Sequence, residues 1–198
     1  MEGRSEGTAP RMETRQTISE DYRRQQQELH KNPHYGIASI AYAPIVKQLL
    51  QQLGAHSIAD YGAGKCNLKR KLDELGVTGI GYFPYDPAFP EYGTPRSADL
   101  VCCIDVLEHI EPDYLDNVLG DLRDIVRKYG FLTIHTGPAM KVLADGRNAH
   151  LIQKPRSWWL PILSKYFEVI HLQGSAGGFW VVVVPRAEGL DPPSPESA

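Results

Sequence analysis

The sequence predicts an α/β protein with a mostly parallel sheet, and three observations support this prediction. Short apolar runs alternate along the chain with segments whose apolar residues follow helical spacing. A glycine-rich turn joins the first of these runs to the next helix pattern. The last two runs are separated only by the Gly-rich segment 174–178. Alternating strands and helices are typical of a parallel sheet covered on both faces, and the final pair predicts an antiparallel hairpin at one edge.

The individual elements follow from apolar spacing and from the residues that end helices and strands. Residues 18–31 are polar and helix-prone, and the Asn-Pro pair after them ends the pattern. Residues 40–53 have the spacing of an amphipathic helix, which Gly54 ends. Further strands are expected at 57–60, 78–83, 99–104, 131–135, 168–173 and 178–184, and further helices at 67–75, 112–128 and 157–166.

Length and composition are those of one ordinary globular domain with two polar ends. The chain has 198 residues, of which 42% are hydrophobic and 23% charged, enough for a single core. We expect one domain over residues 16–186 and disordered tails at 1–15 and 187–198, which carry little apolar content. Within the domain, 16–53 is expected to form an N-terminal helical lid that includes His30.

Charge and cysteine content argue against several classes of partner. The net charge of −3 gives no reason to expect general binding of nucleic acid or of a membrane surface. No apolar run is long enough to span a bilayer, and the N-terminus lacks the apolar segment of a signal peptide. Three cysteines are too few and too badly spaced for a disulfide framework or a zinc site. We therefore expect a cytoplasmic protein without a membrane partner.

The turn after the first predicted strand carries the strongest functional signal. It reads SIADYGAGKCN, so that an apolar run ends in Asp60 and is followed by Gly62 and Gly64. The glycines allow a tight turn and a close approach of a ligand to the backbone, and the aspartate can accept hydrogen bonds from it. A dinucleotide motif requires Gly or Ala in place of Asn67, and a Walker phosphate loop requires Ser or Thr in place of Cys66. Both of those ligand classes are therefore disfavoured.

Acidic residues also mark the ends of the second predicted strand and of the strand after it. Asp86 follows Gly62 by 24 residues, which suits one loop–helix–strand unit. A carboxylate there can accept hydrogen bonds from both hydroxyls of a ribose. The next strand runs into Asp105, Val, Leu, Glu108 and His109. For both aspartates a purely structural role, capping the turn that follows, remains an alternative.

The glycine turn after Asp60, the strand that ends at Asp86 and the strand that runs into residues 105–109 follow one another in the order found in the class I S-adenosylmethionine (SAM) dependent methyltransferases. The chain resembles that family over roughly residues 37–185. The resemblance implies a Rossmann-like three-layer fold with SAM lying across the strand ends and S-adenosylhomocysteine (SAH) as the product. It also implies the positions of the cofactor-binding residues. Asp60, Gly62 and Gly64 would face the methionine and ribose part, Asp86 the ribose, and Tyr61 and Asp105 would lie close by.

The chain departs from the family's pattern at residues 87–98. Only 13 residues lead from Asp86 to Asp99, and three of them are prolines, whereas family members usually have a helix and a third strand there. We therefore expect the third-strand region to be shortened or missing. Which residues hold the adenine stays open, with Phe83 and Leu107 as candidates.

Three histidines near the predicted strand ends are candidates for catalysis: His109, His135 and His150. Methyl transfer from an activated sulfonium mainly needs alignment of the reactants in a dry site. A general base helps when the acceptor must lose a proton, and histidine suits that role near neutral pH. The long segment 136–159, rich in Gly, Pro, Arg and His, is the candidate substrate region. One histidine in such a place is often structural, but three together favour a catalytic role.

We therefore predict a SAM-dependent methyltransferase that modifies an oxygen or nitrogen of a small molecule; no residue is assigned to a metal, and whether a metal is used stays open. An alternative is a metal-assisted 2′-O-methyltransferase of small RNAs, because Asp-x-x-Glu-His at 105–109 with His150 downstream could bind a divalent metal. That family has Glu in place of Asp105, and no basic patch for RNA is evident. A second alternative is a catalytically degenerate binding module, which the short 87–98 region favours and the intact acidic positions oppose. The acceptor and the oligomeric state stay unassigned.

Overall fold

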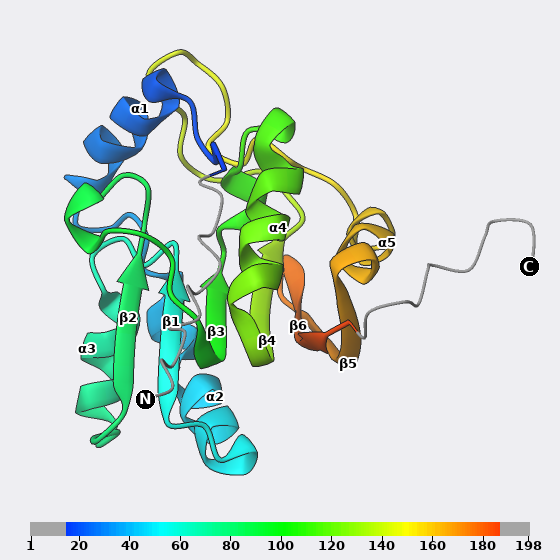
Figure 1. Ribbon diagram of the computed structural model, residues 1–198. Helices are drawn as coiled ribbons and strands as arrows, with labels where there is room; N and C mark the ends of the chain where they lie inside the picture. Colours follow the sequence, from blue (N-terminus) through cyan, green and yellow to red (C-terminus); the bar gives the residue numbers. More distant parts are fainter. Residues whose placement is uncertain (1–14, 187–198) are drawn as a thin grey trace, which may run out of the picture.

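The computed structural model describes residues 15–186, which form a sheet of six strands between two layers of helices (Figure 1). Among the helices in this range, none combines the length and the apolar content needed to cross a membrane. The two tails expected to be disordered lie outside the described residues, except for Arg15. Its guanidinium forms ion pairs with Asp121 and Asp124 at 3.1 and 2.7 Å.

The sheet has the strand order β2-β1-β3-β4-β6-β5. The first four of these strands are parallel to one another, and β6 runs antiparallel to both of its neighbours. This arrangement confirms the predicted mostly parallel sheet with an antiparallel C-terminal hairpin. The strands are β1 (Ser57–Tyr61), β2 (Gly81–Tyr85), β3 (Ala98–Ile104), β4 (Val126–His135), β5 (Phe167–Ser175) and β6 (Gly178–Pro185).

Helices cover both faces of the sheet, as the alternation of patterns predicted. α2 and α3 pack together on one face, and α4 and α5 pack together on the other. Each pair encloses its own buried apolar cluster, around Ile58 and Leu68 on the first face and around Trp159 and Phe179 on the second. α1 lies beyond the carboxyl ends of β1 and β2 (Figure 1). The helices are α1 (Glu20–His30), α2 (Ala38–Leu53), α3 (Asn67–Glu74), α4 (Leu115–Ile125) and α5 (Arg156–Tyr166).

The connection between β2 and β3 confirms the predicted shortening of the third-strand region. It contains a single 3-10 turn, Pro90–Tyr92, and neither a strand nor an α-helix. Proline lacks a backbone N–H, so the prolines at 87, 90 and 95 cannot donate to a strand ladder. As a result β2 is an edge strand of the sheet.

The predicted helix over 112–128 was wrong at both ends. The segment Pro112–Tyr114 is a 3-10 turn, and the α-helix ends at Ile125. Val126 already pairs with Ala98 in the sheet and is buried. A β-branched residue packs well on a half-buried pleated surface, which favours a strand at this position although the preceding residues are helical.

The strand expected at 78–83 begins later, at Gly81. Gly79 has a φ of +72°, a left-handed conformation that does not continue into a strand. The first ladder contact of this segment is the Gly81 N–H, which donates to the carbonyl of His56 at 2.9 Å. The shift moves the end of the strand to Tyr85, directly before Asp86.

Candidate functional site

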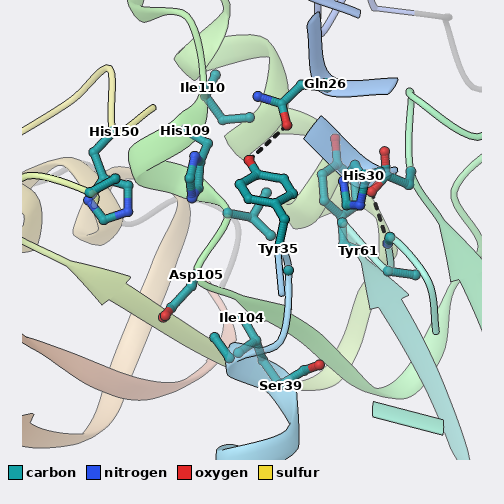
Figure 2. A pocket seen from close by; sticks show the side chains of 18 of the residues that line it. Gln26, His30, Tyr35, Ser39, Tyr61, Ile104, Asp105, His109, Ile110 and His150 are labelled. Atoms are coloured by element: carbon teal, nitrogen blue, oxygen red, sulfur yellow. Dashed lines mark hydrogen bonds between the residues drawn. The ribbon is translucent and has the colours of Figure 1, made fainter. Parts of the chain in front are cut away.

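A cavity of about 430 Å³ lies at the carboxyl edge of the sheet. The ends of β1, β3 and β4 border it from below, and α1 and the loop after β4 border it from above (Figure 2). Parallel strands end at the same edge, which is why acids and histidines far apart in the sequence meet there. The lining includes all nine residues that were predicted to bind the cofactor or to take part in catalysis: Asp60, Tyr61, Gly62, Gly64, Asp86, Asp105, His109, His135 and His150.

The glycine loop between β1 and α3 is tightly enclosed. Gly62 and Gly64 have φ values of +81° and +48°, which favour glycine. A Cβ at Gly62 would collide with the side chain of Val106, and one at Gly64 would lie 2.7 Å from Cε1 of His30. The backbone turn therefore requires both glycines, and the space beside the loop is shared with these two side chains.

Asp86 is held by the backbone of two loops. Its Oδ2 accepts a hydrogen bond from the N–H of Gly64 at 2.9 Å, and its Oδ1 accepts one from the N–H of Ala88 at 2.8 Å. The side chain is only 8% exposed, and burial raises the pKa of its carboxyl group. Asp86 thus caps the turn that follows it, as the structural alternative expected, and also ties β2 to the glycine loop and borders the cavity.

The two residues at the end of β1 have different surroundings. Asp60 is 3% exposed and accepts a hydrogen bond from the hydroxyl of Tyr82. Burial raises the pKa of Asp60 to about 7, since desolvation outweighs the effect of that hydrogen bond. Tyr61 borders the cavity too, but its ring packs at 4.8 Å from that of Tyr85 and its hydroxyl lies 3.5 Å from Asp121. Its side chain therefore belongs mainly to the core beneath α4.

Asp105 follows β3 in a left-handed conformation, with a φ of +51°. Its backbone N–H donates to the hydroxyl of Thr133 at 2.9 Å, and that hydroxyl donates in turn to the Asp105 carboxylate. A left-handed non-glycine residue is uncommon, although aspartate is among the types that tolerate it. The contacts with β4 hold Asp105 at the edge of the cavity, which the glycine loop and the histidines also border.

The three candidate histidines form one cluster. The ring of His150 lies 4.7 Å from that of His109 and 4.9 Å from that of His135. The Nδ1 atoms of His109 and His150 lie 2.8 and 2.7 Å from the carbonyls of Ala149 and Gly137. A carbonyl can only accept, so each Nδ1 carries the proton and each Nε2 keeps a lone pair. Burial lowers the pKa of His109 to about 3 and lowers that of His150, so both rings are neutral near pH 7.

Glu108, which the site prediction did not include, is the most buried acid beside this cluster. It is 0% exposed, and burial raises the pKa of its carboxyl group well above the usual range. Its Oε1 accepts a hydrogen bond from the N–H of His135 at 2.8 Å, whereas its Oε2 has no hydrogen-bond partner among residues 15–186. In the sequence it was noted only as part of the Asp-x-x-Glu-His pattern at 105–109, on which the metal-assisted alternative rests.

His30 and its neighbours from α1 and the following turn were also missed as site residues. The ring of His30 lies 5.0 Å from the rings of Tyr35 and Phe89, and it borders the cavity (Figure 2). Tyr35 donates a hydrogen bond from its hydroxyl to Gln26 at 2.9 Å. Burial lowers the pKa of His30 to about 4. By contrast, His34 is exposed and its ring takes no part in the cavity.

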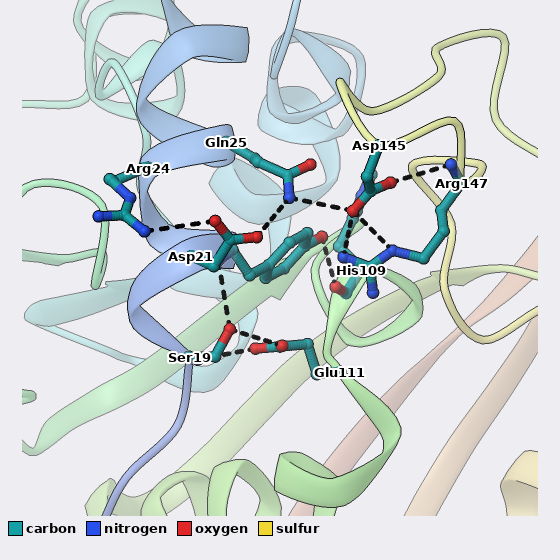
Figure 3. Close-up of polar contacts among 9 residues, drawn as sticks. Ser19, Asp21, Arg24, Gln25, His109, Glu111, Asp145 and Arg147 are labelled. Carbon is teal, nitrogen blue, oxygen red and sulfur yellow. Dashed lines mark hydrogen bonds and ion pairs between the residues drawn. The ribbon is translucent and has the colours of Figure 1, made fainter.

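Polar contacts hold α1 over the cavity (Figure 3). The hydroxyl of Tyr22 donates to the carbonyl of His109 at 2.7 Å, and the N–H and hydroxyl of Ser19 both donate to Glu111 at 2.7 Å. Gln25 contacts Asp145 in the loop after β4 at 3.0 Å. α1 is therefore attached to the segment after β3 and to the loop after β4, and the predicted lid function stays a prediction.

The two adenine candidates do not reach the cavity. Leu107 is fully buried in the cluster beneath α4 and α5. Phe83 lies on β2, and the guanidinium of Arg96 stacks 4.0 Å from the centre of its ring. Neither side chain is among the residues that line the cavity. A sequence cannot distinguish a core position from a pocket position when both are apolar.

The candidate substrate segment 136–159 closes the other side of the cavity. Leu143 and Ala149 are buried in a small apolar cluster with Tyr22 of α1. Met140 borders the cavity and is fully exposed. Part of the segment is thus fixed against α1, and its tip lies at the cavity mouth.

Comparisons with known proteins agree with the fold. No protein-family model matches the sequence, and no curated protein matches it. Among solved structures, the PH0226 protein of Pyrococcus horikoshii aligns with a TM-score of 0.57 at 12% identity, covering 85% of this chain and all of that one. A 1,6-didemethyltoxoflavin N1-methyltransferase of Burkholderia thailandensis, with its substrate and SAH bound, aligns at 0.55 and 16%, covering 87% and 91%.

A third structure, the mitomycin 7-O-methyltransferase MmcR, aligns with a TM-score of 0.56 at 15% identity. The match covers 75% of this chain and 54% of MmcR, so the chain spans about half the length of that enzyme. At sequence identities this low, the structural similarity shows a shared fold and nothing more. The chain has the Rossmann-like α/β fold of SAM-dependent methyltransferases, as the glycine loop and the acidic strand ends predicted.

Proposed function

We propose that the protein is a SAM-dependent methyltransferase that acts on an oxygen or nitrogen of a small molecule and releases SAH. One observation carries this proposal: a single cavity has the glycine loop and Asp86 on one side and the histidine cluster on the other. Its volume lies within the range of about 300–1,000 Å³ typical of small-molecule sites. The names of two similar structures, the toxoflavin and mitomycin enzymes, are those of small-molecule methyltransferases and support the same reading.

The ionisable lining of the cavity favours a positively charged ligand. Asp60, Asp86 and Asp105 border it, and Lys141 is the only Lys or Arg among the described residues that do. Burial raises the pKa of Asp60 and Asp86, so a nearby cation would stabilise their ionised forms. SAM carries a sulfonium and an ammonium group and satisfies this requirement.

We assign a role to each cofactor-binding residue from the resemblance of the sequence to class I SAM-dependent methyltransferases. Each oxygen of Asp86 already accepts one backbone hydrogen bond and keeps a lone pair for a ribose hydroxyl. Asp60, Gly62 and Gly64 are assigned to the methionine and ribose part. Tyr61 and Asp105 are assigned to the immediate surroundings of the cofactor.

SAM supplies a methyl group on a sulfonium that is already activated, so the protein must align the acceptor and remove its proton. His150 is suited to the second task, because its Nδ1 proton is fixed on the carbonyl of Gly137 and its Nε2 can accept a proton. The acceptor's O–H or N–H proton passes to the imidazole as the new bond to the methyl carbon forms and the carbon–sulfur bond breaks. His109 and His135 complete the histidine cluster beside it.

The test is release of SAH from SAM by the purified protein with a panel of hydroxyl and amine acceptors. We expect acceptor-dependent release, with His135→Gln and His150→Gln slowing turnover by at least about 100-fold. Both variants should bind SAM as the unmodified protein does, as should the exposed control His34→Gln. If His135→Gln and His150→Gln lost cofactor affinity as much as turnover, the histidines would be structural.

A binding module that has lost catalysis is the second candidate. Two observations favour it. The helix and strand that family members have between β2 and β3 are missing, and the side chains of His30 and Val106 occupy the space beside the glycine loop. A protein that is folded but does not bind SAM would support this candidate. For the RNA methyltransferase alternative, the net charge of −3 offers no support.

A further inference from the structure

We propose that the acceptor is an amphiphilic molecule: its hydroxyl or amine enters the cavity, and an apolar part of its body lies outside, on an apolar rim. The apolar rim consists of Ile37, Ile40, Met140 and Val142. Calling the ligand an acceptor rests on the proposed methyl transfer, whereas its binding to the rim is measured without any reaction.

The four residues of the apolar rim are exposed to solvent at the cavity. Met140 is fully exposed, and Val142 and Ile37 are 59% and 45% exposed. Ile37 and Met140 border the cavity, so their exposed surfaces lie where it opens to solvent. Among residues 15–186 only three other large apolar side chains are exposed, and none of them borders this cavity. Single exposed apolar residues are ordinary, but several that gather at one cavity are typical of a binding site.

Met140 and Val142 are exposed because of how their segment pairs. Val142 forms an antiparallel bridge with Asn148. The N–H of Leu143 donates to the carbonyl of Arg147 at 2.8 Å. Alternate residues of a paired segment point to opposite faces, and Leu143 is buried in the apolar cluster that the segment forms with α1. Met140 and Val142 therefore share the other face, where polar residues are expected unless a partner covers it.

This segment is held in place, so its part of the rim is formed before a ligand binds. The side-chain amide of Asn148 donates to the carbonyl of Ala139 at 2.8 Å, and its oxygen accepts from the N–H of Ala139 at 2.9 Å. Gln25 of α1 contacts Asp145 at the tip of the segment at 3.0 Å (Figure 3). A preformed surface binds a ligand at a smaller entropic cost than one that must first become ordered.

On α2 an apolar row continues beyond the part of the helix that the core covers. The buried residues of this helix are Ala43, Val46 and Leu50. Ile40 lies three residues before Ala43, and Ile37 three before Ile40, so each neighbours the next on the helix surface. The row thus leads from the core to the cavity, which Ile37 borders. It provides the second apolar part of the rim.

The size of the cavity leaves little room for a whole acceptor beside the cofactor. Its volume of about 430 Å³ is towards the lower end of the range of about 300–1,000 Å³ for sites that enclose one small molecule. SAM, with its adenine, ribose and methionine parts, takes up much of this space when it binds there. The space beside the histidine cluster then receives the reacting end of the acceptor, and the rest of the molecule lies at the opening.

The rim determines the chemistry of the part of the acceptor that lies outside. Its side chains offer apolar contact and no strong hydrogen-bonding group, and methionine adapts its shape to irregular apolar ligands. Lys141, between Met140 and Val142, also borders the cavity, and its aliphatic stem can cover an apolar chain while the ammonium stays in water. The proposal therefore selects an alkyl- or aryl-bearing alcohol, phenol or amine over a sugar or a nucleoside.

The test is calorimetric titration of the full chain, in the presence of SAH, with the n-alkyl esters of 4-hydroxybenzoic acid from methyl to hexyl. We expect each added CH₂ to tighten binding about 2-fold, less than the roughly 4-fold that complete burial at about 0.8 kcal/mol per CH₂ would give. In Met140→Gln/Val142→Thr this gain should fall below about 1.3-fold per CH₂, while the methyl ester binds as before.

Two further variants complete the design. Ile37→Thr, on the other part of the rim, should also reduce the gain per CH₂. The matched control is Ile170→Thr, which changes an exposed isoleucine of β5 away from the cavity and should behave as the unmodified protein does. Where the esters are methylated, the same gain should appear as a lower KM with an unchanged kcat, because the rim contributes equally to ground-state and transition-state binding.

Two results would overturn the proposal. One is the absence of any gain with chain length in the folded, unmodified protein, even if the methyl ester is methylated. The other is an unchanged gain in folded Met140→Gln/Val142→Thr, or in Ile37→Thr if the double variant fails to fold. If that unchanged gain came with loss of co-sedimentation with phosphatidylcholine vesicles, the rim would bind a membrane surface instead. Failure of the proposed function has a different signature, since the gain would then persist without release of SAH from SAM.

Discussion

The imidazole of His30 lies over Gly64, so closely that a Cβ on the glycine would come within 2.7 Å of its Cε1. The ring is enclosed by Tyr35 and Phe89, each at 5.0 Å, and its Nδ1 is buried without a partner among the described residues. α1 thus places a neutral ring directly on the loop to which the cofactor's methionine part is assigned. The position of α1, with the ring of His30 enclosed against Gly64, therefore requires that this ring be neutral.

The first prediction concerns the pH dependence of stability. The pKa of His30 is lowered to about 4 by burial, against 6.5 in the unfolded chain, so the unfolded state binds the extra proton first as pH falls. The stability associated with neutral His30 is present above about pH 6.5 and is lost towards pH 4. Between these values the unmodified protein should lose roughly 2 kcal/mol more free energy of unfolding than His30→Gln does.

Urea unfolding at pH 7, 6, 5 and 4 checks this difference. Other groups, including Asp60 with its raised pKa, titrate in the same range with the opposite sign, but they are common to both proteins and cancel. The control His34→Gln, at an exposed histidine, should follow the unmodified protein. Parallel curves for the unmodified protein and His30→Gln would show that His30 titrates normally.

A second prediction compares two glycines with similar φ values. Gly62 has a φ of +81° and its Cβ would collide with Val106, whereas Gly146 has a φ of +87° and open space beside it. Gly146→Ala should therefore report backbone strain alone, about 1 kcal/mol. Gly62→Ala should cost roughly 1–3 kcal/mol more in the free energy of unfolding, because the clash adds overpacking. Equal costs in urea unfolding would mean that the loop can move away from Val106.

A third prediction concerns the attachment of α1. Tyr22 is buried and donates to the carbonyl of His109, so Tyr22→Phe leaves that carbonyl unpaired and should cost about 1–2 kcal/mol. Trypsin cleavage at the exposed Lys31 should become faster, and SAH should slow it if α1 closes on the cofactor. The matched control is Tyr166→Phe, whose hydroxyl donates to exposed Asp116 and should contribute about 0.5 kcal/mol or less. If both substitutions had identical effects, the hydroxyl of Tyr22 would not contribute to the attachment of α1.

The sequence predicted those parts of the site that lie at strand ends. Asp60, Asp86 and Asp105 each follow an apolar run, and parallel strands bring such positions to one edge whatever the rest of the chain does. The helix–strand boundary at Val126 was not predictable, because residues 115–128 are locally compatible with a helix and only the pairing with β3 decides.

Two features of the site depend on tertiary contacts and could not be found from local patterns. Glu108 was visible as part of a Glu-His pair, but its complete burial and its unpaired Oε2 depend on the tertiary structure, in which its polar partners include the N–H groups of His135 and Ile152. His30 lies 34 residues before Gly64 on a helix without distinctive sequence signals. Its contact with the loop exists because Tyr22 and Ser19 attach α1 to the segment after β3.

The central claim, that this cavity binds SAM through the glycine loop and Asp86, is tested most directly by calorimetric titration with SAM and SAH. We expect saturable one-to-one binding of both, weakened about 10- to 100-fold in Asp86→Asn, because a charge-assisted hydrogen bond to the ribose is worth about 1.5–3 kcal/mol. Asp113→Asn, at an exposed aspartate outside the cavity, should bind normally. Absence of binding by the folded protein, or unchanged affinity in Asp86→Asn, would contradict the account.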